Sequence, residues 1–181
     1  MSTPEVQRLF LALWPSAAVR SALRELQCAF PGSAGRAVDD GNLHITLVFL
    51  GSTPPERRHC IEAALDGLER PGFELRLDRL GYWRRPQVVW AGSDAVPPPL
   101  TSLVEDMTKA AVQCGCMLDA RPFRPHLTLF RKVRKPPRDL PDIAPILWPA
   151  NAFALVESVT ASSGVRYQVL NTWPLGGGVS G

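Results

Sequence analysis

A repeated pattern of histidine, threonine and leucine constrains the fold of this chain more than any other feature. The run His44-Ile45-Thr46-Leu47 returns as His126-Leu127-Thr128-Leu129, nearly half of the 181 residues further along. The chain holds only three histidines, and two of them stand in this pattern. The repeat therefore predicts two halves of similar construction, each carrying one copy.

Both copies lie in sequence that is typical of β-strands. Residues 43–50 and 125–130 are rich in β-branched, aromatic and leucine side chains, and glycine, proline or charged residues bound each run. Side chains alternate between the two faces of a strand. Each strand is therefore expected to bury an apolar face and to present its histidine and threonine on the opposite face.

Two imidazoles and two hydroxyls around one substrate group suit phosphoryl chemistry. One histidine can take a proton from the attacking oxygen while the other gives a proton to the leaving oxygen, and each transfer typically contributes about 10²–10⁴-fold. The unperturbed pKa of histidine, roughly 6.5, makes both protonation states accessible near neutrality. Threonine hydroxyls can hold the phosphate oxygens. This chemistry requires neither a metal nor another cofactor.

A lone histidine on a strand is more often structural than catalytic, but two in matched contexts favour a catalytic role. The third histidine, His59, stands between charged residues in an expected helix without a threonine partner. We interpret His59 as a solvated helix residue.

The motifs and their flanks resemble the 2H phosphoesterases, and most closely the bacterial and archaeal RNA 2′,3′-cyclic phosphodiesterases, formerly called 2′-5′ RNA ligases. Residues 8–13 look like the first strand of that family, and residues 42–51 and 121–129 look like its two motifs. Residues 167–170 and 173–175 look like its closing strand. The resemblance thus covers nearly the whole chain.

The resemblance implies a role for each motif residue. His44 is expected to be the proton donor to the leaving 3′ oxygen, and His126 the proton acceptor that activates water and leaves a 2′-phosphate. Thr46 and Thr128 are expected to hold the phosphate. The residues alone leave open which histidine takes which role, and in the reverse, ligation direction the roles exchange.

Basic residues crowd around the second motif, and a mild net charge of +3 with a pI near 8.9 permits an anionic substrate. We interpret Arg124, Arg131 and Lys132 as substrate-binding residues that steer and clamp an RNA backbone. Arg131 has the strand parity of Leu127 and Leu129, which leaves its contact with the scissile phosphate open. A second aromatic and basic patch, Tyr82-Trp83-Arg84-Arg85, is interpreted as packing at a strand end rather than as a base-stacking surface.

The cysteines show no pattern of a metal site. Cys28, Cys60, Cys114 and Cys116 have no C-x-x-C spacing, and with His59 they form no recognised zinc motif. We expect free thiols and a reducing compartment. The apolar stretch 9–14 is too short for a signal peptide, and no segment approaches the roughly 20 apolar residues of a membrane span. The expected location is the cytoplasm.

The order of elements favours an α+β fold with mainly antiparallel sheets, since strands and helices mix without regular alternation. The expected strands are 9–13, 43–50, 73–77, 87–91, 125–130, 153–160 and 166–172, and the expected helices are 16–30, 54–70 and 100–114, with Thr53 capping the second helix. The family resemblance adds two pseudo-symmetric lobes, each a small sheet with outer helices, around a central active-site groove. One bilobal domain over 1–175 and a disordered tail at 176–181 are expected.

The leading hypothesis is a monomeric enzyme that hydrolyses RNA 2′,3′-cyclic phosphate ends without a metal, with reversible 2′-5′ ligation as an accompanying activity. One alternative keeps the site but changes the substrate to another cyclic nucleotide or a 2′-5′ linked molecule. The other is a non-catalytic RNA-binding module. Binding alone would not require histidine and threonine to be paired twice, which disfavours the module.

Overall fold

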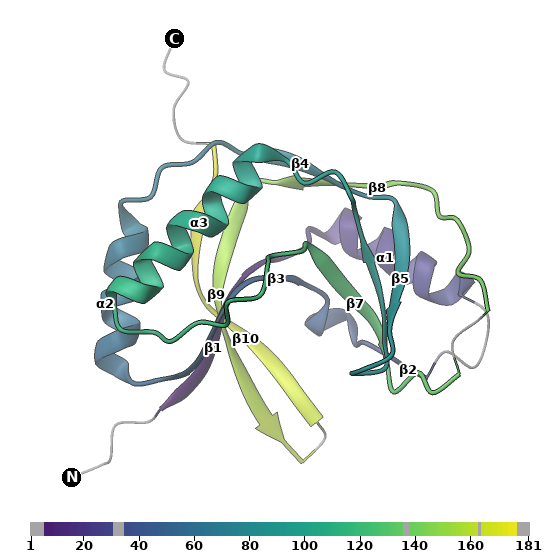
Figure 1. Cartoon of the computed structure of the whole chain (residues 1–181), viewed down its shortest axis with the longest axis horizontal. Helices are drawn as coiled ribbons and strands as arrows, with labels where there is room; N and C mark the ends of the chain where they lie inside the picture. The colour runs from purple at the N-terminus through teal and green to yellow at the C-terminus, as the bar shows by residue number, and fades with distance from the viewer. Residues whose placement is uncertain (1–5, 31–34, 136–137, 163, 177–181) are drawn as a thin grey trace.

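The fold is a large antiparallel sheet with helices packed on it (Figure 1), and the computed structural model describes residues 6–30, 35–135, 138–162 and 164–176. Its elements are β1 (Gln7–Leu13), α1 (Ala17–Ala29), β2 (Arg36–Ala37), the 3-10 turn η1 (Asp40–Asn42), β3 (Ile45–Thr53), α2 (Pro55–Asp66), β4 (Phe73–Leu77), β5 (Arg79–Trp83), β6 (Val88–Gly92), α3 (Pro98–Gln113), β7 (His126–Arg131), β8 (Ile146–Ala150), β9 (Ala152–Ala161) and β10 (Gly164–Pro174).

Two half-sheets meet at the two motif strands. The strand order is β10-β9-β1-β3-β7-β6-β5, with β2 paired to β7 and a separate pair formed by β4 and β8. β3 and β7 share a single residue pair, Ile45 with Leu127, and the half-sheets diverge on either side of it (Figure 1). Helices α2 and α3 lie on the outside of one half, and α1 lies beside the other. The predicted α+β fold with two lobes is confirmed.

Helix α1 forms where the sequence predicts a helix. Ser16 caps it by accepting a hydrogen bond from the backbone N–H of Val19 at 3.3 Å, a contact typically worth about 1 kcal/mol. Val19 and Leu23 recur at helical spacing and are buried against the core. The helix ends at Ala29 with Phe30 as the C-cap, so the expected range 16–30 is confirmed within one residue at each end.

Several local expectations are wrong. Thr53 does not cap α2, because it is the last residue of β3, pairs with Gln7 and donates its hydroxyl to the carbonyl of Gly51. The helix begins at Pro55 and ends at Asp66 rather than at residue 70. The strands β2, β5 and β8 lie where no strand was expected. Of the predicted disordered tail, 177–181 lie outside the described residues.

Each motif strand carries a β-bulge at the leucine of the repeat. Thr46 pairs with Ala12 and Val48 with Leu11, so Leu47 is the extra residue in β3. Thr128 pairs with Trp90 and Phe130 with Val89, so Leu129 is the extra residue in β7. In both strands the bulged leucine and the residue after it are buried together. A bulge shifts the alternation of side chains by one. Side chains that follow each motif therefore point to the face opposite to the one that regular alternation would give them.

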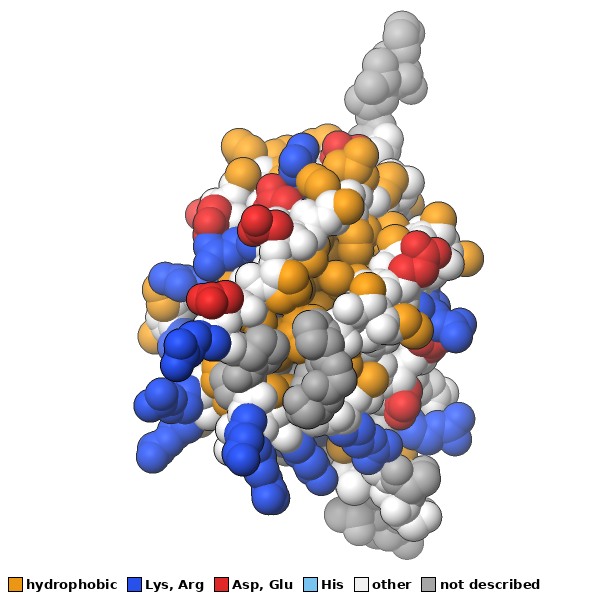
Figure 2. All heavy atoms as spheres, turned by 90° about the vertical axis from the view of Figure 1, so that its right-hand side faces the viewer, with side chains coloured by type: hydrophobic (Ala, Val, Ile, Leu, Met, Phe, Trp, Pro, Cys, Tyr) orange, Lys and Arg blue, Asp and Glu red, His pale blue; other side chains and the backbone are white. Residues whose placement is uncertain are grey.

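A face beside α1 is hollowed and apolar, as Figure 2 shows. The hollow encloses about 760 Å³ between α1 and the segment 141–149, and its lining includes Val19, Leu26, Phe30, Ile143 and Leu147. Lys and Arg side chains gather below it in the same view. None of the predicted site residues lines this hollow, so it lies apart from the candidate site.

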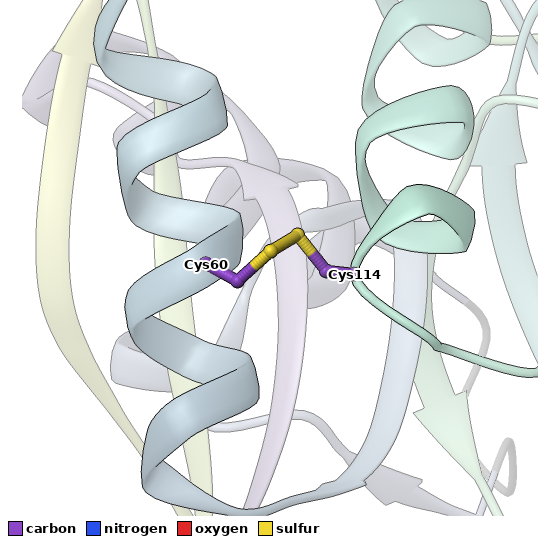
Figure 3. Close-up of a disulfide and its surroundings, with 2 residues drawn as sticks. All are labelled: Cys60 and Cys114. Atoms are coloured by element: carbon purple, nitrogen blue, oxygen red, sulfur yellow. A yellow bond between two sulfur atoms is a disulfide. The ribbon is translucent and has the colours of Figure 1, made fainter.

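The expectation of four free thiols is wrong, because Cys60 and Cys114 form a disulfide (Figure 3). Cys60 lies on α2 and Cys114 caps the end of α3, and packing of the two helices brings their Cα atoms to 5.8 Å. That separation falls within the range a disulfide needs. Cys28 and Cys116 are free.

Removal of this disulfide is expected to destabilise the fold, since it closes a loop of 54 residues. Constraint of the unfolded chain by a loop of this length is worth roughly 2–4 kcal/mol, or about 5–15 °C in Tm for a chain of this size. Thermal unfolding of Cys60→Ser measures the loss, and Cys28→Ser, at an exposed free thiol, is the matched control. An equal Tm for the two variants would contradict the pairing.

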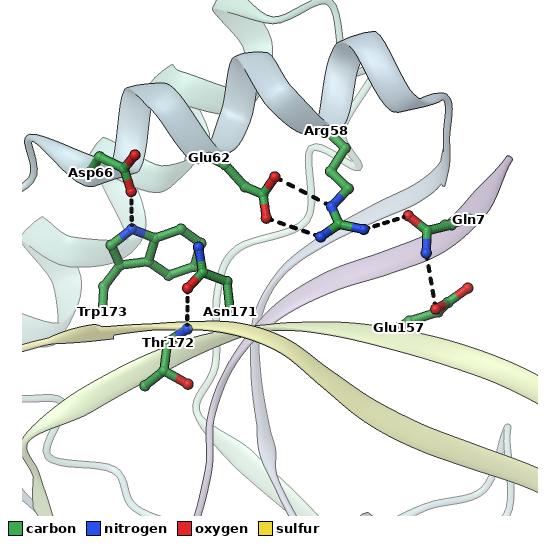
Figure 4. A network of polar contacts seen from close by, with 8 residues as sticks. All are labelled: Gln7, Arg58, Glu62, Asp66, Glu157, Asn171, Thr172 and Trp173. Atoms are coloured by element: carbon green, nitrogen blue, oxygen red, sulfur yellow. Dashed lines mark hydrogen bonds and ion pairs between the residues drawn. The ribbon is translucent and has the colours of Figure 1, made fainter. Parts of the chain in front are cut away.

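Helix α2 is tied to the sheet by polar contacts along its length (Figure 4). Arg58 forms an ion pair with Glu62 and donates to Gln7 of β1, which donates to Glu157 of β9. Near the other end of the helix, the indole N–H of Trp173 donates to Asp66 at 2.7 Å. These contacts fix α2 across β1, β9 and β10.

Among the described helices, none combines the length and apolar character that crossing a bilayer requires.

Candidate active site

The structure brings the four predicted motif residues together on one face of the sheet. Ile45 and Leu127 lie opposite each other in the antiparallel register and are both fully buried. Paired residues point to the same face and their neighbours point to the other. His44, Thr46, His126 and Thr128 therefore share the opposite face at the junction of the half-sheets, where all four are half-buried.

Both histidines are held in the same way. The Nδ1 of His44 lies 2.7 Å from the carbonyl oxygen of Asn42, and the Nδ1 of His126 lies 2.8 Å from the carbonyl oxygen of Arg124. A carbonyl oxygen only accepts, so Nδ1 carries the hydrogen in each ring. Nε2 is therefore the atom of each ring that can take or give a proton. In His44 it lies 3.1 Å from the Thr46 hydroxyl.

Aromatic side chains enclose His44. The ring of Trp14 stacks on it with centroids 5.7 Å apart, and the rings of Phe10 and Tyr167 each lie 4.9 Å away. This burial lowers the pKa of His44 to about 4; the hydrogen bond to Asn42 opposes the shift, and the charges of Arg131 and His126 add to it. His44 is therefore neutral near pH 7 in the free protein.

His126 has a similar but more open environment. Trp83 meets its ring edge-on with centroids 4.5 Å apart. Burial lowers the pKa of His126, and the hydrogen bond to the Arg124 carbonyl opposes that shift. The two rings thus lie close enough for the charge of one to affect the other.

The low pKa of His44 predicts a loss of stability in mild acid. Below pH 6.5 the unfolded chain gains a proton at His44, whereas the folded chain stays neutral there until about pH 4. Stability is therefore complete above pH 6.5 and falls through this window, by roughly 2 kcal/mol at pH 5 from His44 alone. Urea unfolding at pH 7.5 and 5.0 is expected to show a smaller loss in His44→Gln than in the wild type. Equal losses in both would contradict the pKa shift.

The bulge in β7 decides where Arg131 points. In a regular strand Arg131 would share the buried face of Leu127, but the extra residue Leu129 moves it to the face of His126 and Thr128. Arg131 is exposed there and acts on the pKa of His44. Together with Lys132 it lines a cavity of about 290 Å³, whose lining also includes Asn42 and Tyr167, two residues that contact His44.

The other predicted residues lie further from the histidines. The side chain of Arg124 is exposed, and its backbone carbonyl is the part that contacts His126. His59 is exposed on α2, as interpreted from the sequence. The Tyr82 hydroxyl donates to the carbonyl of Val133 at 2.7 Å, which agrees with strand-end packing.

Sequence reasoning missed the residues that enclose the histidines. Trp83 was interpreted as packing, yet it contacts His126. Phe10, Trp14 and Tyr167 come from β1, the segment after it and β10, and Asn42 from η1. Only the pairing of β1 with β3 and β9 brings them together, and no local motif signals that pairing.

Within the part of the chain that the structure describes, no three His, Cys, Asp or Glu residues are placed to hold a metal ion.

Comparison with known proteins agrees with this geometry. Residues 13–161 match the family model of the 2′-5′ RNA ligase superfamily. The RNA 2′,3′-cyclic phosphodiesterase of Escherichia coli K12 is 35% identical over 172 residues, which cover 94% of this chain and 98% of the relative. The enzyme of the same name from Thermus thermophilus is 34% identical, with 94% and 91% covered.

Solved structures show the same fold. E. coli LigT in its apo form superposes with a TM-score of 0.88 at 34% identity, with 94% of this chain and 98% of that chain covered. LigT in complex with 3′-AMP superposes with a TM-score of 0.87 at 35% identity, with 94% and 99% covered. On this evidence of sequence and fold, the chain belongs to the 2′-5′ RNA ligase superfamily.

Proposed function

We propose that this chain is a phosphodiesterase that opens the 2′,3′-cyclic phosphate at the end of an RNA to a 2′-phosphate, acting as a cytoplasmic monomer without a metal. The observation that carries the proposal is that both histidines present Nε2 on one face, because a backbone carbonyl oxygen accepts from Nδ1 in each ring. The names of the full-length relatives support the same activity.

In the proposed reaction, His126 takes a proton from water at Nε2 as the water oxygen attacks phosphorus. The bond between phosphorus and the 3′ oxygen breaks, and His44 gives its Nε2 proton to that oxygen. The product carries a 2′-phosphate and a 3′-hydroxyl, and exchange of one proton with solvent restores the two rings. Thr46 and Thr128 donate hydrogen bonds to the non-bridging oxygens, where negative charge is held in the transition state.

His44 must carry a proton to act as the acid, although its pKa in the free protein is about 4. A phosphate anion beside the ring favours the charged form and raises that pKa. Substrate binding therefore supplies the condition under which His44 can act as the donor. With the 5′-hydroxyl of a second RNA in place of water, the same proton transfers would form a 2′-5′ bond. The exchange of roles that was expected for ligation therefore applies instead to the cleavage of that bond.

The test is turnover of a short RNA that ends in a 2′,3′-cyclic phosphate, with EDTA present. Conversion to a 2′-phosphate by the wild type, and not by His44→Ala or His126→Ala, is the expected result. Formation of a 3′-phosphate would contradict the assignment of the leaving oxygen. Loss of activity in EDTA that zinc or magnesium restores would contradict metal independence.

Two other outcomes would redirect the proposal. Turnover of a small cyclic nucleotide or a 2′-5′ linked dinucleotide, without turnover of the RNA end, would keep the site and change the substrate. Tight RNA binding that the two histidine variants retain, with no turnover of any of these substrates, would indicate a binding module.

A further inference from the structure

We propose that the cavity beside His44, lined by Arg36, Arg131 and Lys132, binds the phosphodiester that precedes the terminal nucleotide, so that the enzyme prefers a chain of at least two nucleotides over a cyclic mononucleotide. This inference rests on the proposed function and names which part of the substrate the cavity recognises. It assigns a binding role to Arg36, which no motif contains.

The cavity lies between the two halves of the molecule. One wall comes from Arg36 on β2 and from Arg131 and Lys132 at the end of β7, and the other comes from the start of β10 at residues 164–167. Its volume of about 290 Å³ is at the small end of ligand pockets. The cavity therefore suits one phosphate with part of its sugar rather than a folded RNA element.

The charges of the cavity favour an anion. Arg36, Arg131 and Lys132 line it, and Asp39 is the one acidic residue of the lining. The Arg36 guanidinium lies 4.0 Å from the Asp39 carboxylate, and both side chains are more than 60% exposed, so this pair is weak. Arg131 and Lys132 make no ion pair with any residue in the described ranges. The lining thus carries an excess of positive charge.

The backbone holds these cations in place. Lys132 has a φ of 59°, a left-handed conformation that is uncommon for a residue with a side chain. Arg36 pairs with Arg131 across β2 and β7, and at Gly35 (φ 83°) a Cβ would lie 2.4 Å from the Arg131 carbonyl oxygen. Only glycine permits this close approach. Uncommon backbone conformations held by their surroundings gather at functional sites.

The cavity is also connected to the catalytic face. Asn42 lines it, and its side chain donates to the carbonyl of Val165 and accepts from the N–H of Tyr167, while its own carbonyl holds His44. Along β7, Arg131 follows Thr128 by three residues, a rise of at most about 10 Å that the bulge at Leu129 shortens. A phosphate at the histidines and a second phosphate in the cavity can therefore belong to neighbouring positions of one strand.

The experiment compares three substrates: cytidine 2′,3′-cyclic phosphate, a dinucleotide with the same cyclic end, and that dinucleotide with a neutral methylphosphonate linkage. In the wild type, kcat/KM for the charged dinucleotide is expected to exceed that for the neutral dinucleotide about tenfold. Arg36→Ala/Lys132→Ala is expected to reduce this ratio to roughly two. The matched control Arg76→Ala/Lys109→Ala removes the same charge from exposed side chains outside the cavity and should keep the wild-type ratio.

The outcomes separate the two proposals. Hydrolysis of all three substrates by the wild type with equal kcat/KM for the two dinucleotides would overturn this inference and leave the proposed function standing. A tenfold ratio that survives in Arg36→Ala/Lys132→Ala would overturn the assignment to this cavity. Failure of the wild type to hydrolyse any of the three would overturn the proposed function, and this inference with it.

Discussion

Replacing His126 by alanine is expected to lower kcat for a cyclic-phosphate RNA end by about 10²–10⁴-fold, the range of one proton transfer. His44→Ala should cause a loss of the same order. Both side chains lie on the half-buried face and contribute no buried apolar surface to the main core, so the fold should persist. Steady-state kinetics and circular dichroism of the same preparations measure the two effects separately.

His59→Ala provides the matched control, because His59 is an exposed histidine on α2 away from this face. Its kcat should equal that of the wild type. Thr128→Val should lie between these extremes, since it removes one hydrogen bond to the phosphate and leaves both proton transfers. Unfolding of His44→Ala or His126→Ala would show that the residue supports the core, contrary to its placement on the half-buried face outside the main core.

The dependence of kcat/KM on pH is expected to be bell-shaped, with its maximum between about pH 4 and 6.5. The profile reports the free enzyme, in which one histidine must be protonated and the other neutral. Burial lowers the pKa of His44 to about 4 and also lowers the pKa of His126. On the basic side of the bell, kcat/KM should fall tenfold for each pH unit. A profile that rises steadily through pH 8 would contradict the two-histidine scheme.

The pH profile of kcat/KM for Trp14→Ala shows which limb of the bell reports the pKa of His44. Trp14 stacks on that ring, and its removal admits water and should move the limb near pH 4 towards 6.5. The optimum of kcat should also lie at higher pH than that of kcat/KM, because bound phosphate favours the charged rings. Identical acid limbs in the wild type and Trp14→Ala would show that burial by this side chain does not set the pKa.

The sequence predicted the features of this structure that depend on local patterns and on the repeated motif. The spacing of Val19 and Leu23 predicted α1, and the alternation around His44 and His126 predicted which face each side chain would take. The two matched copies predicted two lobes. Periodicity reports how one segment divides between core and solvent, and the first two inferences needed only that information, whereas the two lobes followed from the repeat and the family resemblance.

The remaining features depend on contacts between distant segments. Cys60 and Cys114 are paired because α2 packs beside α3, and cysteine spacing does not reveal such a pairing. Thr53 has the residue type of a helix cap, but its pairing with Gln7 keeps it in β3. Arg131 has the parity of a buried residue, and only the pairing of β7 with β6 shows the bulge that turns it outwards.

The paired bulges have a consequence for the orientation of the substrate strand. Two equal halves would form a site without direction, in which either histidine met either end of the substrate equally well. The residue that follows each bulged pair breaks this equivalence. In the first half it is Phe49, with the Arg8 guanidinium 4.8 Å above its ring, and in the second it is the bare charge of Arg131. One side of the duplicated site thus offers an aromatic ring with a cation over it and the other a cation alone, and a strand with two different ends meets a different surface on each side.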